Sequence, residues 1–283
     1  MNTKMIEYQM FTTCNLKCNY CYNYFDQSPE ALETHIADLQ KISSLADKKT
    51  CMVVNGGEPL LLKELAKLIN SVEVDTNIIT YTNGTLPFKV YEKFVNEVRK
   101  DNLYFTVSVH YAELLRTNNV NESYIANVKY LINSLPNLKI NIVFTEDFTN
   151  KEFLDGLTNL LTEFRDAGLK YINILLEDSL KEKPFEAVRL INSPHFKEFF
   201  EGLRSFKYKH CMWNNRDDDI SCLHMWLRKE VMSPPLPYKE LSFLRKGDHY
   251  VFENNFGFTS DLLTGDMLSN LEEFIEEIRP ELQ

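Results

Sequence analysis

The sequence is poor in glycine, in long apolar runs and in positive charge. It has nine glycines in 283 residues, where average usage of about 7% would give roughly twenty. No apolar run approaches the ~18 residues that a membrane-spanning helix needs. Lys and Arg number 31 against 41 Asp and Glu, a formal net charge of -10. This balance makes nucleic acid an unlikely general partner, because binding to phosphates requires a basic surface.

The N-terminal residues and the cysteines indicate a cytoplasmic protein. Residues 1–7 lack the long apolar stretch of a signal peptide. Three of the six cysteines, Cys14, Cys18 and Cys21, lie within eight residues, while the others are scattered. A secreted disulfide framework would be shorter and denser in cysteine. We therefore interpret the clustered trio as metal ligands or redox groups.

Strand-like and helix-like segments alternate six times in the first two thirds of the chain. Strands are expected at 6–11, 51–54, 77–82, 103–109, 139–144 and 171–176, each followed by a helical pattern. The first helix is expected to begin at Ser28-Pro29 and the last at Ser193-Pro194. Six such units predict an α/β fold with parallel strands, either a partial (β/α)6 TIM-like barrel or an open doubly wound sheet, and in either the function lies at the carboxyl ends of the strands.

The pattern changes near residue 207. An acidic run, Asp217 to Asp219, a proline-rich stretch, a pair of short strands at 249–258 and a terminal helix at 270–278 follow. We expect a barrel domain at 1–206 and a smaller C-terminal α+β appendage at 207–283. The acidic run is interpreted as a solvated turn.

The cysteine loop directly follows the first predicted strand. Three thiolates from one loop can hold a [4Fe–4S] cluster, which normally takes four cysteines, so one iron would keep an open coordination position. A zinc site is the alternative, although zinc would need a fourth ligand and usually a C-x2-C pair. Spacing alone favours iron–sulfur and leaves zinc open.

A second motif, Asn55-Gly56-Gly57-Glu58-Pro59, ends the second predicted strand. Two glycines let a ligand approach the bare backbone, Glu58 offers a carboxylate to an ammonium group, and Pro59 opens the next helix. In a chain with so little glycine, this pair after a cysteine trio indicates a binding site.

Together the two motifs resemble those of the radical S-adenosylmethionine superfamily. That family has C-x3-C-x2-C with an aromatic residue before the last cysteine, here Tyr20, followed by a GGEP turn. The resemblance covers roughly residues 4–205. The form of the cysteine motif and the turn Thr82-Asn83-Gly84 look most like the branch that modifies peptides and proteins.

The resemblance implies a set of cofactors and roles. Cys14, Cys18 and Cys21 would hold three irons of a [4Fe–4S] cluster, and S-adenosylmethionine would bind the fourth. A reductant such as flavodoxin or ferredoxin would supply the electron that cleaves S-adenosylmethionine to a 5′-deoxyadenosyl radical. The other cofactor-binding residues are expected to be Tyr20 at the adenine, Gly56, Gly57, Glu58 and Pro59 at the amino group, Thr82 and Asn83 in the neighbouring turn, Ser108 at the ribose or carboxylate, and Arg116 at the carboxylate.

Other residues carry weaker indications. His110, after the fourth strand, is a candidate catalytic residue, as a substrate contact or proton donor, although a hydrogen-bonded loop histidine explains it equally simply. Cys51 lies in an apolar strand and is expected to be structural. Three polar residues, Asn141, Asn173 and Glu177, could point into the barrel. A second metal site is possible but less favoured at His210, Cys211, Cys222 and His224.

The predicted function is hydrogen-atom abstraction, of the oxidoreductase or isomerase type, from a peptide or protein side chain. A small metabolite, such as a sugar, nucleotide or amino acid, is the alternative substrate. A non-catalytic iron–sulfur or zinc protein for electron transfer or interaction is the alternative of another class. The GGEP turn argues against that class, because an electron carrier has no use for it.

Overall fold

The computed structural model describes residues 4–21, 28–44, 46, 48, 50–99, 101–176, 189–190, 193–203, 240–246, 249–254 and 260–261. Their strands form one sheet in the order β6-β5-β4-β3-β2-β1-β7-β8-β9. The strands are β1 (Lys4–Gln9), β2 (Thr50–Asn55), β3 (Asn77–Thr82), β4 (Leu103–Val109), β5 (Lys139–Phe144), β6 (Ile172–Leu176), β7 (Glu240–Lys246), β8 (His249–Asn254) and β9 (Ser260–Asp261).

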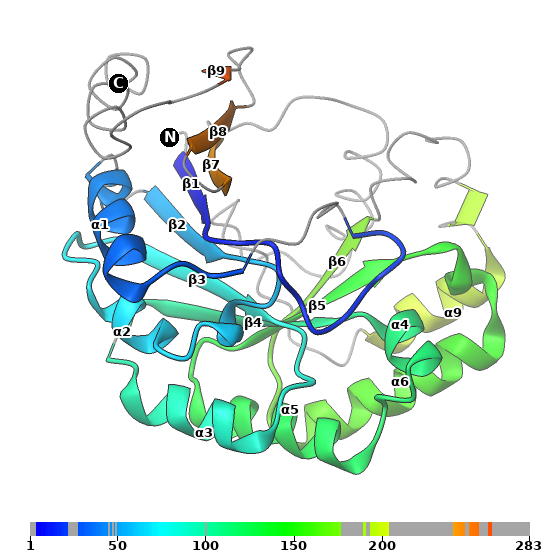
Figure 1. Ribbon diagram of the computed structural model, residues 1–283. Coiled ribbons are helices and arrows are strands. Elements are labelled where there is room, and N and C mark those ends of the chain that lie inside the picture. The colour runs from blue at the N-terminus through cyan, green and yellow to red at the C-terminus, as the bar shows by residue number, and fades with distance from the viewer. Residues whose placement is uncertain are drawn as a thin grey trace.

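The first six strands are parallel, and each pairs with its predecessor in the chain. Within the described ranges β6 pairs with β5 alone and β1 does not meet it, so the curved sheet stays open (Figure 1). The predicted α/β fold with an open, partial barrel is confirmed.

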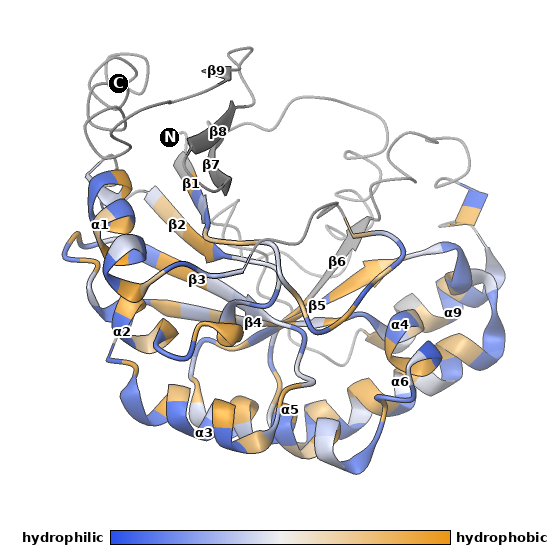
Figure 2. Cartoon of the chain, in the orientation of Figure 1, coloured by the Kyte–Doolittle hydropathy of each residue, from blue (hydrophilic) through white to orange (hydrophobic). Residues whose placement is uncertain are grey.

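Helices connect the strands and cover the outer face of the sheet (Figure 1). They are α1 (Leu32–Ser43), α2 (Leu65–Asn70), α3 (Phe88–Glu97), α4 (Tyr111–Arg116), α5 (Glu122–Ser134), α6 (Lys151–Asp166) and α9 (Pro194–Gly202), with short 3-10 helices η1 (Pro59–Leu61) and η2 (Glu146–Thr149). Apolar residues follow each longer helix at three- and four-residue spacing, so one side of the helix packs on the sheet and the other is polar (Figure 2).

Two helix starts were predicted from capping patterns in the sequence, and the structure confirms one of them. Phe196 N donates to Ser193 Oγ over 3.2 Å, so the predicted start of the last helix is confirmed. The predicted start of the first helix at Ser28-Pro29 is wrong, because α1 begins at Leu32. The backbone N–H of Glu30 instead donates to the side chain of His35, at Nε2, over 3.1 Å. This hydrogen bond holds the residues before Leu32 against the first turn of α1.

Alternation along the strands gives the sheet two different faces. Ile140 and Ile142 of β5 are fully buried in the main core, which lies between sheet and helices. Asn141 lies between them, so its side chain faces the interior of the barrel, as the sequence analysis allowed. Its backbone is in register with Ser108 of β4 and with Asn173 of β6. Ser108 lies likewise between the buried core residues Val107 and Val109, so β4 and β5 both place a polar side chain on the interior face.

The C-terminal strands extend the same sheet. β7 pairs in parallel with β1, and β8 pairs antiparallel with β7. In place of the predicted pair of short strands within 249–258, the structure has one strand, β8, at 249–254, and its partner β7 was not expected. The helix at 270–278, the acidic run and the possible second metal site lie outside the described residues. The boundary at residue 207 stays a prediction.

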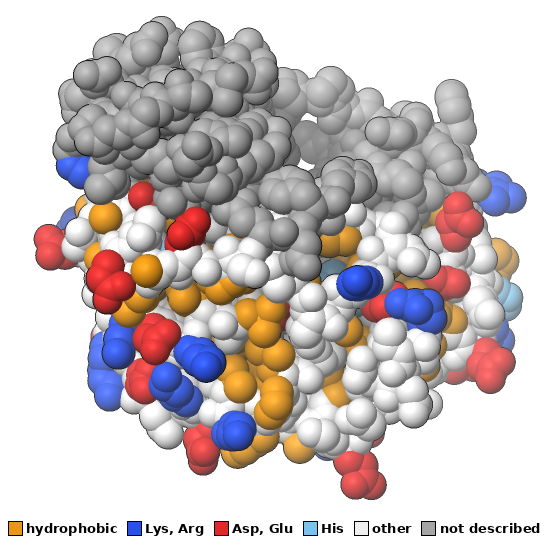
Figure 3. Space-filling model, viewed as in Figure 1, with side chains coloured by type: hydrophobic (Ala, Val, Ile, Leu, Met, Phe, Trp, Pro, Cys, Tyr) orange, Lys and Arg blue, Asp and Glu red, His pale blue; other side chains and the backbone are white. Residues whose placement is uncertain are grey.

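The surface agrees with the mixed composition. Figure 3 shows acidic and basic side chains interspersed over the coloured part of the molecule. In the part of the chain that the structure describes, no helix is long and apolar enough to cross a membrane.

Candidate cofactor site

The cysteine loop leaves the carboxyl end of β1 and crosses the neighbouring strand ends. Its cysteines, Cys14, Cys18 and Cys21, are partly buried and not in disulfides. The N–H of Cys21 donates to the carbonyl oxygen of Cys18 over 3.1 Å, which closes a tight turn between the last two cysteines. The chain path therefore brings three reduced thiols to the functional end of the barrel.

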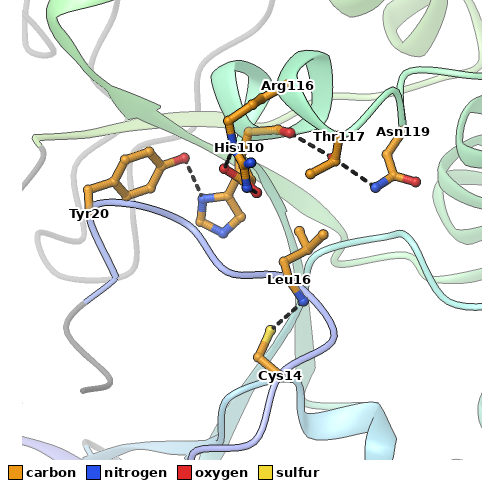
Figure 4. A network of polar contacts seen from close by, with 8 residues as sticks. Cys14, Leu16, Tyr20, His110, Arg116, Thr117 and Asn119 are labelled. Atoms are coloured by element: carbon orange, nitrogen blue, oxygen red, sulfur yellow. Dashed lines mark hydrogen bonds and ion pairs between the residues drawn. The ribbon is translucent and has the colours of Figure 1, made fainter. Parts of the chain in front are cut away.

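Two N–H groups point at the sulfur of Cys14. The backbone N–H of Leu16 donates to Cys14 Sγ over 3.4 Å (Figure 4), and Asn83 Nδ2 donates over 3.7 Å. Donors to a sulfur stabilise the thiolate and set the properties of a metal bound to it. These contacts suit Cys14 to be a metal ligand.

The thiols of Cys14 and Cys18 are protonated at neutral pH without a metal. Burial raises the pKa of Cys14, and burial followed by the nearby Glu113 raises the pKa of Cys18 to about 12. The other cysteines of the loop add to the rise of the pKa at Cys18. Iron would displace these protons, and its charge would compensate the thiolates.

The spacing of the thiols bears on which metal they fit. Three ligands of one zinc ion, with Zn–S bonds of about 2.3 Å, must have their sulfurs within about 4 Å of each other. In the described residues no three His, Cys, Asp or Glu side chains are grouped tightly enough to hold a single ion. A [4Fe–4S] cluster takes each cysteine on a different iron and needs a wider triangle. Three thiols are the ligand type that such a cluster takes, so the donor set of the loop fits it.

The glycine turn after β2 packs directly against this loop. The N–H of Glu58 donates to the carbonyl oxygen of Thr13 over 3.0 Å. A Cβ on Gly57 would lie 2.2 Å from the carbonyl oxygens of Thr12 and Thr13, and one on Gly56 would lie 3.2 Å from the ring of Phe11. Gly57 is thus needed for the turn to dock onto the backbone that leads into Cys14, and Gly56 lets it lie close to the Phe11 ring.

The Glu58 side chain is turned into the protein and is 1% exposed. Its Oε2 accepts from the N–H of Asn83 over 2.7 Å, and its Oε1 accepts from the N–H of Leu60 over 3.3 Å. The Thr82 hydroxyl also donates to it. The carboxylate therefore joins the ends of β2 and β3 and caps η1, which begins at Pro59, while the backbone of the turn borders the cysteine loop.

The turn after β3 forms the third part of the site. Asn83 Nδ2 donates to Asn15 Oδ1 over 2.8 Å, and Asn15 Nδ2 donates to Thr85 Oγ1 over 2.7 Å. Gly84 has a φ of +81°, a left-handed conformation that favours glycine. Asn83 consequently touches both the cysteine loop and Glu58, and it fixes the three turns relative to one another.

His110, which directly follows β4, contacts Tyr20 of the cysteine loop. The Nδ1 of His110 lies 3.1 Å from the Tyr20 hydroxyl, with ring centroids 5.7 Å apart (Figure 4). Burial lowers the pKa of His110 to about 4, although Glu113 acts in the opposite direction. The imidazole is therefore neutral at pH 7. This contact supports a role for His110 in orienting Tyr20, and its predicted catalytic role stays a prediction.

Arg116 is the last residue of α4, the helix that begins directly after His110. Its Nε donates to Glu113 Oε2 over 2.9 Å, and its Nη2 donates to Glu113 Oε1. Arg116, Glu113 and Tyr20 line a cleft of about 420 Å³ that is also lined by residues 145–147. Ser108 lies on the interior face of β4, away from this cleft. The structure thus places Arg116 near Tyr20 and Cys18, while the predicted ligand contacts of Ser108 and Arg116 stay predictions.

Several residues of the site were not expected from the sequence. Asn15 and Thr85 fix the turns, and Glu113 is a buried carboxylate next to Cys18. Glu113 precedes Arg116 by three residues, the spacing of ion pairs on a helix, and that signal could have found it. Cys51 is 2% exposed in a small cluster with Val53 and Ile79, apart from the cysteine loop. Glu177 lies outside the described residues.

The buried carboxylate of Glu58 gives a testable pH dependence. Burial raises the pKa of Glu58 to about 7, so the folded protein binds this proton more tightly than the unfolded chain does. Its contribution to the free energy of unfolding is present below pH ~4.5 and is lost as the pH rises to ~7, by on the order of 3 kcal/mol. Denaturant unfolding of the wild type and of Glu58→Gln under anaerobic conditions should show this.

The difference between these two proteins isolates Glu58, because both keep His110 and the cysteines. We expect the wild type to lose stability relative to Glu58→Gln between the two pH values and the difference to be flat above pH ~7. A difference that is constant from pH ~4 to ~8 would contradict the burial of an ionisable carboxylate here.

Comparison with known proteins places the site in a family. Residues 8–160, more than half of the chain, match the model of the radical SAM superfamily. GTP 3′,8-cyclase of Clostridium perfringens (strain 13 / Type A) is 30% identical over 174 residues, which are 57% of this chain and 52% of the relative. The chain thus spans about half the length of this curated relative.

Two solved structures share the fold. Streptococcus suis SuiB bound to precursor peptide SuiA has a TM-score of 0.56 at 14% identity, over 96% of this chain and 64% of that one. The enzyme anSMEcpe with bound AdoMet and Cp18Cys peptide has a TM-score of 0.52 at 16% identity, over 71% of this chain and 60% of that one. The match of residues 8–160 contains the cysteine loop, the glycine turn and the turn after β3. The chain belongs to the radical S-adenosylmethionine superfamily, and its cofactors are the [4Fe–4S] cluster and the S-adenosylmethionine of that family.

Proposed function

We propose that this protein cleaves S-adenosylmethionine reductively and abstracts a hydrogen atom from a peptide or protein side chain. The observation that carries the radical chemistry is the docking of the glycine turn on the cysteine loop, with Gly57 against the carbonyl groups of Thr12 and Thr13. That contact puts a ligand-binding backbone turn beside three thiols, an arrangement that electron transfer alone does not require.

The bound cofactors supply the 5′-deoxyadenosyl radical, and the residues of the chain bind, orient and shield. Cys14, Cys18 and Cys21 would hold the cluster, with Leu16 and Asn83 donating to the sulfur of Cys14. Tyr20, held by His110, would contact the adenine. The exposed edge of Arg116 would bind the carboxylate of S-adenosylmethionine. A flavodoxin or ferredoxin would supply the electron.

The fold likeness supports a peptide substrate. The structure of SuiB was solved with a precursor peptide, and its likeness extends over 96% of this chain, beyond the barrel. The name of the curated relative favours a nucleotide, which is the second candidate, but that match covers 57% of the chain. The net reaction we propose is of the oxidoreductase or isomerase type.

Hydrogen transfer to 5′-deoxyadenosine separates the two substrates. Reconstituted, reduced protein would be incubated anaerobically with S-adenosylmethionine and either deuterated peptides encoded next to its gene or deuterated GTP. We expect deuterium in 5′-deoxyadenosine with a peptide and none with GTP. Deuterium from GTP alone would contradict the peptide substrate, and the absence of any 5′-deoxyadenosine would contradict the radical chemistry.

A further inference from the structure

Glu113 is a buried carboxylate that the predicted chemistry does not use. Its side chain is 3% exposed, whereas that of its partner Arg116 is 55% exposed. Both carboxylate oxygens accept from Arg116, one from Nε and one from Nη2. A buried carboxylate is costly without such a paired, hydrogen-bonded partner. The two residues therefore form one unit, a buried anion beneath a surface cation.

The unit is attached firmly to the end of α4. The Thr117 hydroxyl donates to the carbonyl oxygen of Glu113 over 2.7 Å, and Asn119 Nδ2 donates to Thr117 Oγ1 over 2.8 Å (Figure 4). These contacts fix the backbone of Glu113, and the fork-to-fork pairing then fixes the guanidinium. An arginine held in this way loses little further side-chain freedom when it binds a second anion.

Glu113 occupies only one edge of the guanidinium. Within the described residues, Arg116 Nη1 has no hydrogen-bond partner. Arg116 lines the cleft together with Asn19 and Tyr20 of the cysteine loop. The cation is therefore close both to the cysteine loop and to the aromatic residue expected at the adenine. Glu113 compensates the positive charge of Arg116 at one edge of the guanidinium and leaves the outer edge, with Nη1, open.

We propose that Glu113 is a positioning residue that holds Arg116 so that its outer edge binds the carboxylate of S-adenosylmethionine. The inference rests on the proposed function, because it assumes that S-adenosylmethionine binds in this site. Glu113 itself does not touch the ligand. Its effect passes entirely through Arg116, and this sets it apart from a residue that merely stabilises α4.

The test is a double-mutant cycle on the reconstituted protein. The variants are Glu113→Gln, Arg116→Gln and the double variant, and the readouts are the dissociation constants of S-adenosylmethionine and of decarboxylated S-adenosylmethionine. A glutamine puts an amide NH2 against one of the N–H donors of Arg116. Glu113→Gln should weaken binding of S-adenosylmethionine roughly tenfold and leave binding of the decarboxylated ligand unchanged.

The double variant gives the sharpest outcome. It should bind S-adenosylmethionine no more weakly than Arg116→Gln, because Glu113 has no effect without its partner. KM for S-adenosylmethionine should rise while kcat changes little. Glu163→Gln, which breaks the exposed ion pair with Lys129 between α6 and α5, is the matched control and should bind both ligands as the wild type does.

Three results would overturn the proposal. They are wild-type affinity in Glu113→Gln, losses in the double variant that equal the product of the two single losses, and an equal loss for both ligands. If Glu113→Gln does not fold, Glu113→Asp is used in its place, because aspartate keeps the charge. Weaker binding of S-adenosylmethionine alone then supports the proposal, and wild-type affinity for it overturns the proposal. Failure of the wild type to bind S-adenosylmethionine would contradict the proposed function instead.

Discussion

Replacing Cys18 by alanine should abolish both the cluster and turnover. The wild type should hold about four irons per chain after anaerobic reconstitution, and Cys18→Ala should hold almost none and release no 5′-deoxyadenosine. Cys18 lies between the other two cysteines of the loop, and the one further cysteine among the described residues, Cys51, lies apart from them in β2. Iron and sulfide analysis, the visible spectrum and chromatography of the products measure this.

Cys51→Ala is the matched control for this experiment. Cys51 is a buried thiol in β2 that packs against Val53 and Ile79, so its loss should cost about 1 kcal/mol of stability as a small cavity. It should keep the iron, the colour and the turnover of the wild type. Retention of iron in Cys18→Ala, or loss of iron in Cys51→Ala, would show that the ligand set is wrong.

Gly57→Ala is expected to have the second large effect. The new Cβ would lie 2.2 Å from two backbone oxygens, those of Thr12 and Thr13, and backbone cannot move aside as a flexible side chain can. The glycine turn must therefore separate from the cysteine loop, at a cost of about 3 kcal/mol or more. We expect a lower Tm, poor retention of iron and loss of binding of S-adenosylmethionine.

Gly202→Ala separates this contact from a general effect of replacing glycine. A Cβ on Gly202 meets nothing within 4 Å, and Gly202 ends α9, where alanine is the better helix former. Its stability should be unchanged or higher by up to about 1 kcal/mol. A Gly57→Ala protein with the Tm and iron content of the wild type would mean that the two turns are not docked as described.

The barrel could be predicted because its strands are short segments rich in β-branched and aromatic residues. Segments such as 103–109 and 139–144 read as strands in the sequence, and the structure has β4 and β5 at those residues. The start of α1 was wrong because Ser28-Pro29 is a pattern common to helix starts and turns. The contact that decides between them, from Glu30 to His35, cannot be read from the order of the residues.

The motifs of the site could also be predicted, but the direction of their side chains could not. The inward turn of Glu58 depends on the N–H of Asn83, which is 25 residues away. The pairing of β7 with β1 depends on a segment more than 200 residues later in the chain. Such contacts are decided by tertiary packing, so periodicity and composition carry no information on them.

The account rests on an iron that the three cysteines leave open for S-adenosylmethionine. The most direct measurement is electron–nuclear double resonance of the reduced, reconstituted protein with S-adenosylmethionine isotope-labelled in its carboxylate and amino groups. The account predicts hyperfine coupling from both labels to the cluster, lost in Cys18→Ala and retained in Cys51→Ala. A reduced, intact cluster that shows no coupling to either label would contradict it.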